Sequence, residues 1–216
     1  MNYSIKLGAL ALALLGALGT ANATLLVPNV PTTSVAVVGS SFGGTLLDSA
    51  VSNVSTPGWS GTARTAVYDT GSGLDFYYQF TNNVSSLTGI ERFTGFNFSQ
   101  LGSSAVDVYQ TSSAFGIFTA GTEKSDYADR TINGVIGISF VPNGNSKINP
   151  GTTSFTQIIR TTATKYEAGN FGLLDGYSAN AVAFAPAVPE PESYALLLAG
   201  LGLMGTIARH RTRTSS

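Results

Sequence analysis

The stretch LDFYYQFT, residues 74–81, indicates the fold class of this 216-residue chain. Apolar residues alternate in it with residues of mixed polarity, a period of two that is typical of a β-strand with one face on a core. The apolar face holds Leu74, Phe76, Tyr78 and Phe80. The mixed face holds Asp75, Tyr77, Gln79 and Thr81. The stretch therefore predicts a strand that is packed on at least one side.

Seven further segments have a similar strand character and lie at near-regular spacing around this one. They are residues 64–68, 92–98, 105–110, 115–119, 134–141, 153–160 and 180–184. Turn sequences rich in Gly, Asn and Pro separate several of them, and no amphipathic helix pattern intervenes. The sequence therefore predicts an all-β chain with one antiparallel β-sandwich or jelly-roll-like domain over residues 24–184.

The first 23 residues have the layout of a secretory signal peptide. A single cation, Lys6, precedes an apolar core, and the small residues Ala21 and Ala23 flank Asn22 as in an A-x-A cleavage site. A retained membrane anchor is the alternative, but an apolar core of about a dozen residues is shorter than the roughly 20 that span a bilayer. We therefore expect export, with a mature chain that begins at Thr24.

The composition excludes several kinds of chemistry. The chain has no cysteine and one histidine, His210, so the predicted domain can build neither a disulfide, a thiol nucleophile nor a Ser-His-Asp triad. Its formal net charge is −1 and its charges form no runs, which gives no basic footprint for nucleic acid. We expect no nucleic-acid partner, no metal and no cofactor.

The C-terminal end has three successive parts. A proline-rich linker, residues 185–193, leads into an apolar run, residues 194–208, and a basic tail, residues 209–216. At about 1.5 Å per residue the run reaches about 22 Å, which predicts a short transmembrane helix in a hydrocarbon core of about 30 Å. Cations that directly follow a membrane segment favour the cytoplasmic side. The expected stop-transfer cations are Arg209, Arg211 and Arg213.

A simple C-terminal anchor would have the same three parts, but their residues are more specific than that. The order of Val188, the triplet Pro189-Glu190-Pro191, the apolar helix and the stub Arg209-His210-Arg211 resembles the PEP-CTERM sorting signal of exported bacterial proteins. The resemblance covers residues 188–213 only. The same kind of C-terminal region has also been labelled an ice-binding protein C-terminal domain, a label that describes the tail and gives no evidence of ice binding by the predicted domain.

The resemblance implies a route for the protein. Substrates of this kind are held transiently in the inner membrane of Gram-negative bacteria until an exosortase, a transpeptidase of cysteine-protease type, recognises the Pro-Glu-Pro region. By resemblance, the recognition residues are Pro189, Glu190 and Pro191. Two prolines fix the backbone around one carboxylate, which lowers the ordering entropy that binding must overcome. The implied destination is the cell surface or the medium.

Exosortases are associated with exopolysaccharide and biofilm production, which gives the first functional hypothesis. We expect a non-enzymatic envelope or extracellular-matrix protein that associates with exopolysaccharide. The alternative is a carboxylate-based glycan-active enzyme or a carbohydrate-binding module delivered by the same signal. Aromatic side chains could then form a stacking surface for sugars, although such residues more often serve packing. The candidates for this surface are Trp59, Tyr77, Tyr109, Tyr127 and Tyr166.

Two groups of carboxylates keep the enzymatic alternative open, because two carboxylates suffice for glycoside hydrolysis. The first group is Asp69 and Asp75, on either side of a Thr-Gly-Ser-Gly turn, where Asp69 would more commonly bond its own backbone. The second is Glu123, Asp126 and Asp129, with Lys124 and Arg130 as expected surface partners in a solvated loop. The second group lacks the alternate-residue acidic pattern of a dedicated calcium loop. A free strand edge could also pair with another chain, but the sequence does not identify that edge.

Overall fold

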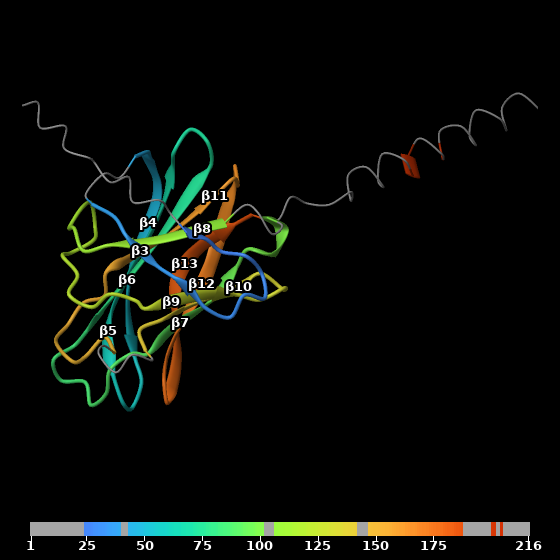
Figure 1. The fold of residues 1–216 in the computed structure, drawn as a ribbon. Coiled ribbons are helices and arrows are strands. Elements are labelled where there is room, and N and C mark those ends of the chain that lie inside the picture. Colours follow the sequence, from blue (N-terminus) through green and yellow to red (C-terminus); the bar gives the residue numbers. More distant parts are fainter. Residues whose placement is uncertain are drawn as a thin grey trace, which may run out of the picture.

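A computed structural model describes residues 24–39, 43–101, 106–141 and 147–187, together with Gly200, Leu201 and Met204. Within these residues the chain forms two sheets packed as a sandwich (Figure 1). Sheet A has the strand order β1-β8-β11-β6-β5-β4, with β3 beside β8, and sheet B has the order β13-β12-β7-β10-β9-β2. All pairings are antiparallel except that of β3 with β8. The predicted all-β sandwich is confirmed.

The strands of sheet A are β1 (Thr24–Leu25), β3 (Ala36–Val37), β4 (Thr45–Ser55), β5 (Ser60–Asp69), β6 (Leu74–Asn82), β8 (Val106–Thr111) and β11 (Thr156–Thr161). The strands of sheet B are β2 (Thr33–Ser34), β7 (Arg92–Asn97), β9 (Tyr127–Arg130), β10 (Val135–Ser139), β12 (Tyr166–Asp175) and β13 (Tyr177–Pro186). A short 3-10 turn, η1 (Ser99–Leu101), follows β7.

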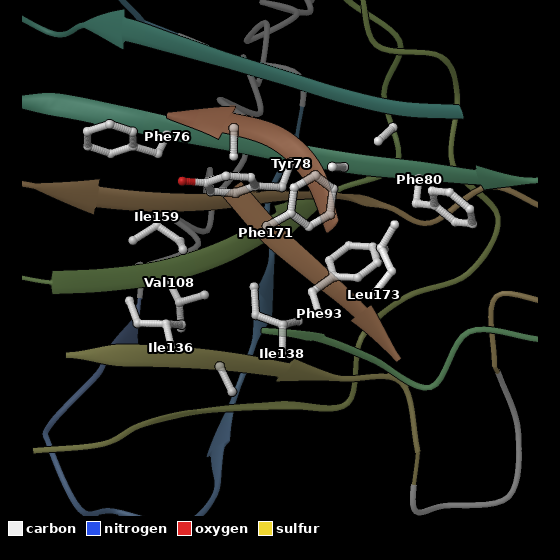
Figure 2. Close-up of a cluster of buried hydrophobic side chains, with 14 of the residues drawn as sticks. Phe76, Tyr78, Phe80, Phe93, Val108, Ile136, Ile138, Ile159, Phe171 and Leu173 are labelled. Atoms are coloured by element: carbon white, nitrogen blue, oxygen red, sulfur yellow. The ribbon is translucent and has the colours of Figure 1, made fainter. Parts of the chain in front are cut away.

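The main core lies between the two sheets, and the apolar face of β6 forms its centre as the sequence predicts. Phe76, Tyr78 and Phe80 are fully buried there. Figure 2 shows them on one side of the cluster, with Phe93 and Phe171 from sheet B facing them. The Tyr78 ring lies 5.6 Å from that of Phe171, and its hydroxyl donates to the Phe184 carbonyl at 2.6 Å. The Tyr78 hydroxyl is therefore buried in the core with its hydrogen bond satisfied.

A second, smaller core lies on the outer face of sheet A. Tyr77 points away from the main core, as expected from strand alternation, yet its side chain is fully buried. The connection between β8 and β9 covers it, and we call residues 112–124 the cover segment. Phe115 and Phe118 of this segment place their rings 5.4 and 5.8 Å from the Tyr77 ring. Sheet A is therefore packed on both faces around β6.

The cover segment contains the one predicted strand that is wrong. Residues 115–119 form a tight turn instead, in which Phe115 and Phe118 exchange backbone hydrogen bonds of 3.1 and 2.8 Å. Gly116 occupies the second position of that turn with a φ of 52°, which favours glycine. The segment is rich in apolar residues because Phe115, Ile117 and Phe118 all pack in the small core around Tyr77.

Two long strands, β4 and β12, were not among the predicted segments. β4 contains a bulge between Leu46 and Asp48, which interrupts the alternation of its apolar residues. β12 contains Gly169 and Gly172, which weaken a strand pattern. β13 also runs into the predicted linker as far as Pro186, a residue that an edge strand tolerates because no ladder N–H is needed there.

Candidate functional site

The predicted sorting and processing residues lie outside the described part of the chain. They are Ala21, Ala23, Pro189, Glu190, Pro191, Arg209, Arg211 and Arg213. The predicted transmembrane run, residues 194–208, also lies outside it except for Gly200, Leu201 and Met204. Among the described residues, no helix has the length and apolar character needed to cross a membrane. The structure does locate the start of the linker, because the Ala187 N–H donates to the Lys165 carbonyl at 3.0 Å beside the end of β13.

The first carboxylate group, Asp69 and Asp75, cannot act as a pair. Asp69 lies opposite Leu74 in the β5–β6 ladder, so its side chain is on the core side of sheet A, whereas Asp75 points to the outer face. Asp69 accepts a hydrogen bond from the Gly71 N–H at 2.8 Å, the local turn interaction that its sequence context predicts. A glycosidase needs two carboxylates that face one sugar, and these two face opposite sides of a sheet.

Asp75 is held in a buried ion pair. Arg160 on β11 lies directly opposite it, and the guanidinium donates to both carboxylate oxygens, at 3.0 Å from Nε and 2.7 Å from Nη2. The Tyr109 hydroxyl donates to the same carboxylate at 2.9 Å. Asp75 is fully buried, while the Arg160 side chain is 44% exposed. These donors occupy both oxygens of Asp75, so the carboxylate is not available as a nucleophile or base.

The electrostatics of the neighbouring groups follow from this ion pair. The hydrogen bond to Asp75 raises the pKa of Arg160, which keeps the guanidinium charged. Burial, with the nearby Asp75 charge, raises the pKa of Tyr109, which keeps its hydroxyl a donor. Asp107 on β8 lies directly opposite Arg160 in the ladder with β11, and partial burial raises the pKa of its carboxyl group. This cluster could not be predicted from the sequence, because Arg160 is far from Asp75 along the chain.

The second carboxylate group is dispersed. Asp129 accepts two hydrogen bonds from Arg92, at 2.6 and 2.9 Å. Glu123 accepts from the neighbouring Thr122 hydroxyl at 3.3 Å. The expectation that Arg130 is a surface partner is wrong: it is buried, and its guanidinium donates to the Phe98 carbonyl. In the described ranges, no three His, Cys, Asp or Glu side chains gather closely enough to hold a metal ion.

Gly137 allows the pairing of Arg92 with Asp129. The Arg92 side chain crosses β10 at Gly137 to reach β9, and a Cβ at that position would collide with the guanidinium. We expect Gly137→Ala to displace Arg92 and to lower the free energy of unfolding by roughly 1 kcal/mol, since the pair is partly exposed. Chemical denaturation measures this loss. The same substitution made in an Arg92→Met background should add little, and a full additional loss there would contradict the explanation.

The aromatic candidates divide into two sets. Trp59, Tyr77 and Tyr109 are buried, so the expectation that they form an exposed stacking surface is wrong. Trp59 packs edge-on against Phe80 at 5.8 Å. Tyr127 and Tyr166 are half-buried and keep part of their surface in contact with solvent. Aromatic residues in a sheet packed on both faces are mostly core, which the alternation of β6 alone could not show.

Tyr127 lines a shallow open pocket of about 420 Å³. The pocket lies between the chain that leads from β1 into β2 and the strand β9. Its other lining residues are Asn29, Val30, Pro31, Asp129, Arg130 and Thr131. The carboxylate of Asp129 is in its ion pair with Arg92 there, so the pocket combines an aromatic ring with polar groups and the buried cation Arg130.

Two buried glutamines, which the sequence did not single out, hold the connection between β8 and β9 against sheet A. The Gln79 side-chain amide donates to the Thr119 carbonyl at 2.7 Å and accepts from the Thr119 N–H at 3.0 Å, as a neighbouring strand would. Gln110 binds the backbone of Ser125 in the same manner, at 2.9 and 2.8 Å. The signal in the sequence is a glutamine inside an apolar strand, because a buried amide must find partners.

The comparisons with known proteins give one match. A family model described as the PEP-CTERM protein-sorting motif matches residues 187–211. No curated protein and no solved structure matched the chain in the same comparisons. The match begins at Ala187, the residue with which the described sandwich ends. The chain therefore carries a PEP-CTERM protein-sorting motif at its C-terminus, which implies an exported, membrane-sorted protein that is processed by an exosortase.

Proposed function

We propose that the sorted domain is a non-enzymatic protein of the cell envelope or extracellular matrix. The observation that carries the proposal is the state of its candidate carboxylates. Asp69 and Asp75 lie on opposite faces of sheet A, and Arg160 and Arg92 neutralise Asp75 and Asp129. This arrangement supports a structural role for these residues in place of acid–base catalysis.

The pocket at Tyr127 supports contact with exopolysaccharide as the finer form of this proposal. Sugars present both apolar C–H faces and hydroxyl groups, so an aromatic ring beside polar groups suits them. The Tyr127 ring and Pro31 supply the apolar contact, while Asn29 and Thr131 supply hydrogen-bonding groups. The pocket is open and shallow, a shape that admits a segment of a polymer more readily than it encloses a small substrate.

The proposal is tested with protein recovered from the surface and medium of its own host. Intact mass should show a chain that starts at Thr24 and ends near Pro191; a chain that retains the apolar run would contradict a matrix location. Incubated with polysaccharide from the same culture, the protein should co-sediment with it and release no new reducing ends. Reducing ends that disappear on Glu123→Gln substitution would establish the glycan-active enzyme instead.

Tyr127→Ala should weaken co-sedimentation with the polysaccharide about fivefold, because one aromatic contact is worth about 1 kcal/mol. Tyr166→Ala is the matched control, since Tyr166 is also half-buried but does not line the pocket. Equal losses in the two variants would place the polysaccharide contact elsewhere. Unchanged binding in both variants would also place the polysaccharide contact elsewhere.

A further inference from the structure

The sandwich has four outer edges, and three of them are protected against pairing with another chain. β1 and β2, at one side, are two-residue strands, too short to template a partner. β13, at the other side of sheet B, turns its free edge inward. The carbonyls of Val182 and Phe184 accept hydrogen bonds from Thr65 at 3.2 Å and Tyr78 at 2.6 Å, both in sheet A.

β4 is the fourth edge, and it lacks these protections. It ends sheet A and is eleven residues long. It contains no proline and no lysine, and Asp48 is its one charged residue. Natural edge strands usually carry such residues to prevent pairing. Val51, near the middle of β4, leaves 58% of its surface exposed.

The hydrogen-bond pattern shows which backbone groups of β4 are free. The Thr56 N–H donates to the Trp59 carbonyl, so the alternation of the antiparallel ladder directs the groups of residues 54, 52 and 50 toward β5. The N–H and C=O groups of Val51, Asn53 and Ser55 therefore point away from the sheet. Ser49 belongs to the same set, and its N–H is taken by the Asp48 carboxylate at 2.7 Å. Asp48 thus ends the free part of the edge.

We propose that the free edge of β4 binds β4 of a second copy of this chain, antiparallel and with Val51 at the two-fold axis. In this register the N–H and C=O groups of the two Val51 residues bond each other, and Asn53 of each copy donates to the Ser49 carbonyl of the other. No charged residues face each other, because this register places Asp48, the one charged residue of β4, opposite Val54 of the other copy. The two exposed Val51 side chains cover each other, and sheet A continues from one copy into the next. This pairing is independent of what the Tyr127 pocket binds.

A second copy fits this edge better than a foreign strand for two reasons. The edge offers no charge pattern that would select a different partner, since charge complementarity is what usually sets such a choice. A two-fold arrangement also lets each free N–H of Val51 and Asn53 meet a free carbonyl of the same short segment, as isologous interfaces require.

The absence of cysteine from the chain makes the test direct. Val51→Cys should form a disulfide-linked or short bis-maleimide-linked dimer in the processed protein recovered from the host. Opposed residues of a hydrogen-bonded antiparallel pair have Cα atoms about 5.5 Å apart, within disulfide range. Val182→Cys is the matched control, because Val182 is 47% exposed on the protected edge of β13. It should not form the dimer.

Val51→Lys should weaken the dimer about tenfold or more in sedimentation velocity, since it brings like charges together at the two-fold axis. Val182→Lys should leave the dimer unchanged, and both lysines stay solvated, so the fold is preserved. A monomeric unsubstituted protein would overturn the proposal. A dimer that resists Val51→Lys, or a cross-link from Val51→Cys to a different protein, would overturn it as well.

Discussion

Arg160→Met is expected to lower the free energy of unfolding by about 3 kcal/mol. The substitution leaves the fully buried Asp75 without its guanidinium partner, and removing one member of a buried ion pair costs roughly 3–5 kcal/mol. The lower end of that range applies because the Arg160 side chain is 44% exposed and partly screened by solvent. Thermal denaturation should show a melting temperature lower by about 6–12 °C for a domain of this size.

Arg64→Met is the matched control for this prediction. Arg64 is a partly buried cation in the same sheet, but it bonds the Thr81 hydroxyl at 2.9 Å and no carboxylate. Its removal should cost less than about 1 kcal/mol, in the range of a single ordinary hydrogen bond. Equal losses in the two variants would show that the apolar stems of the arginines, and not the buried Asp75 charge, determine the effect.

Gln79→Leu is expected to release the cover segment and to cost about 2–3 kcal/mol. Leucine fills a similar volume but leaves the Thr119 N–H and carbonyl without the partners that Gln79 supplies at 3.0 and 2.7 Å. These bonds are part-buried and Thr119 is exposed, so each group left unsatisfied costs toward the lower end of roughly 1–3 kcal/mol, unless the segment lifts and loses the packing of Phe118 on Tyr77. Hydrogen exchange should show the Thr119 amide exchanging about a hundredfold faster, since exchange reports local opening.

Thr122→Ala serves as the control for the cover segment. The Thr122 hydroxyl bonds Glu123 at 3.3 Å and the Thr153 carbonyl at 3.4 Å, in an exposed part of the same segment. Its loss should leave the exchange of the Thr119 amide unchanged. If Thr119 exchanged equally fast in both variants, the segment would be held by many weak contacts, and the role assigned to Gln79 would be wrong.

The sequence predicted those features of the fold that depend on neighbours along the chain. The alternation at residues 74–81 is local, so it identified β6 and both of its faces. What covers those faces depends on residues far along the chain. Tyr77 was expected on a mixed surface, but the cover segment buries it. β4 was missed because the bulge at Leu47 breaks its period.

The same distinction applies to the candidate site. The Asp69 turn interaction could be predicted, because its partner is two residues away. The partners of Asp75 and Asp129 could not, because Arg160 and Arg92 reach them across strands whose pairing the sequence does not specify. Lys124 and Arg130 were expected as partners because they are close in sequence. In a sheet, the residue opposite on the next strand is the closer neighbour.

The position of Ala187 at one end of β13 determines when two copies can pair. β13 has ten residues, spans about 33 Å and runs along β4. Tyr177 at its start lies beside Gly58, and Tyr166, opposite its last residue, reaches Asp48. In an antiparallel β4 pair the two tails would leave from opposite ends. In a dimer whose strands stand upright on the membrane, the six residues between Ala187 and the apolar run extend to at most about 21 Å and cannot bring the distant tail back to the same bilayer. Assembly should therefore follow release, and the Val51→Cys cross-link should appear in the processed form and not in the membrane-held precursor.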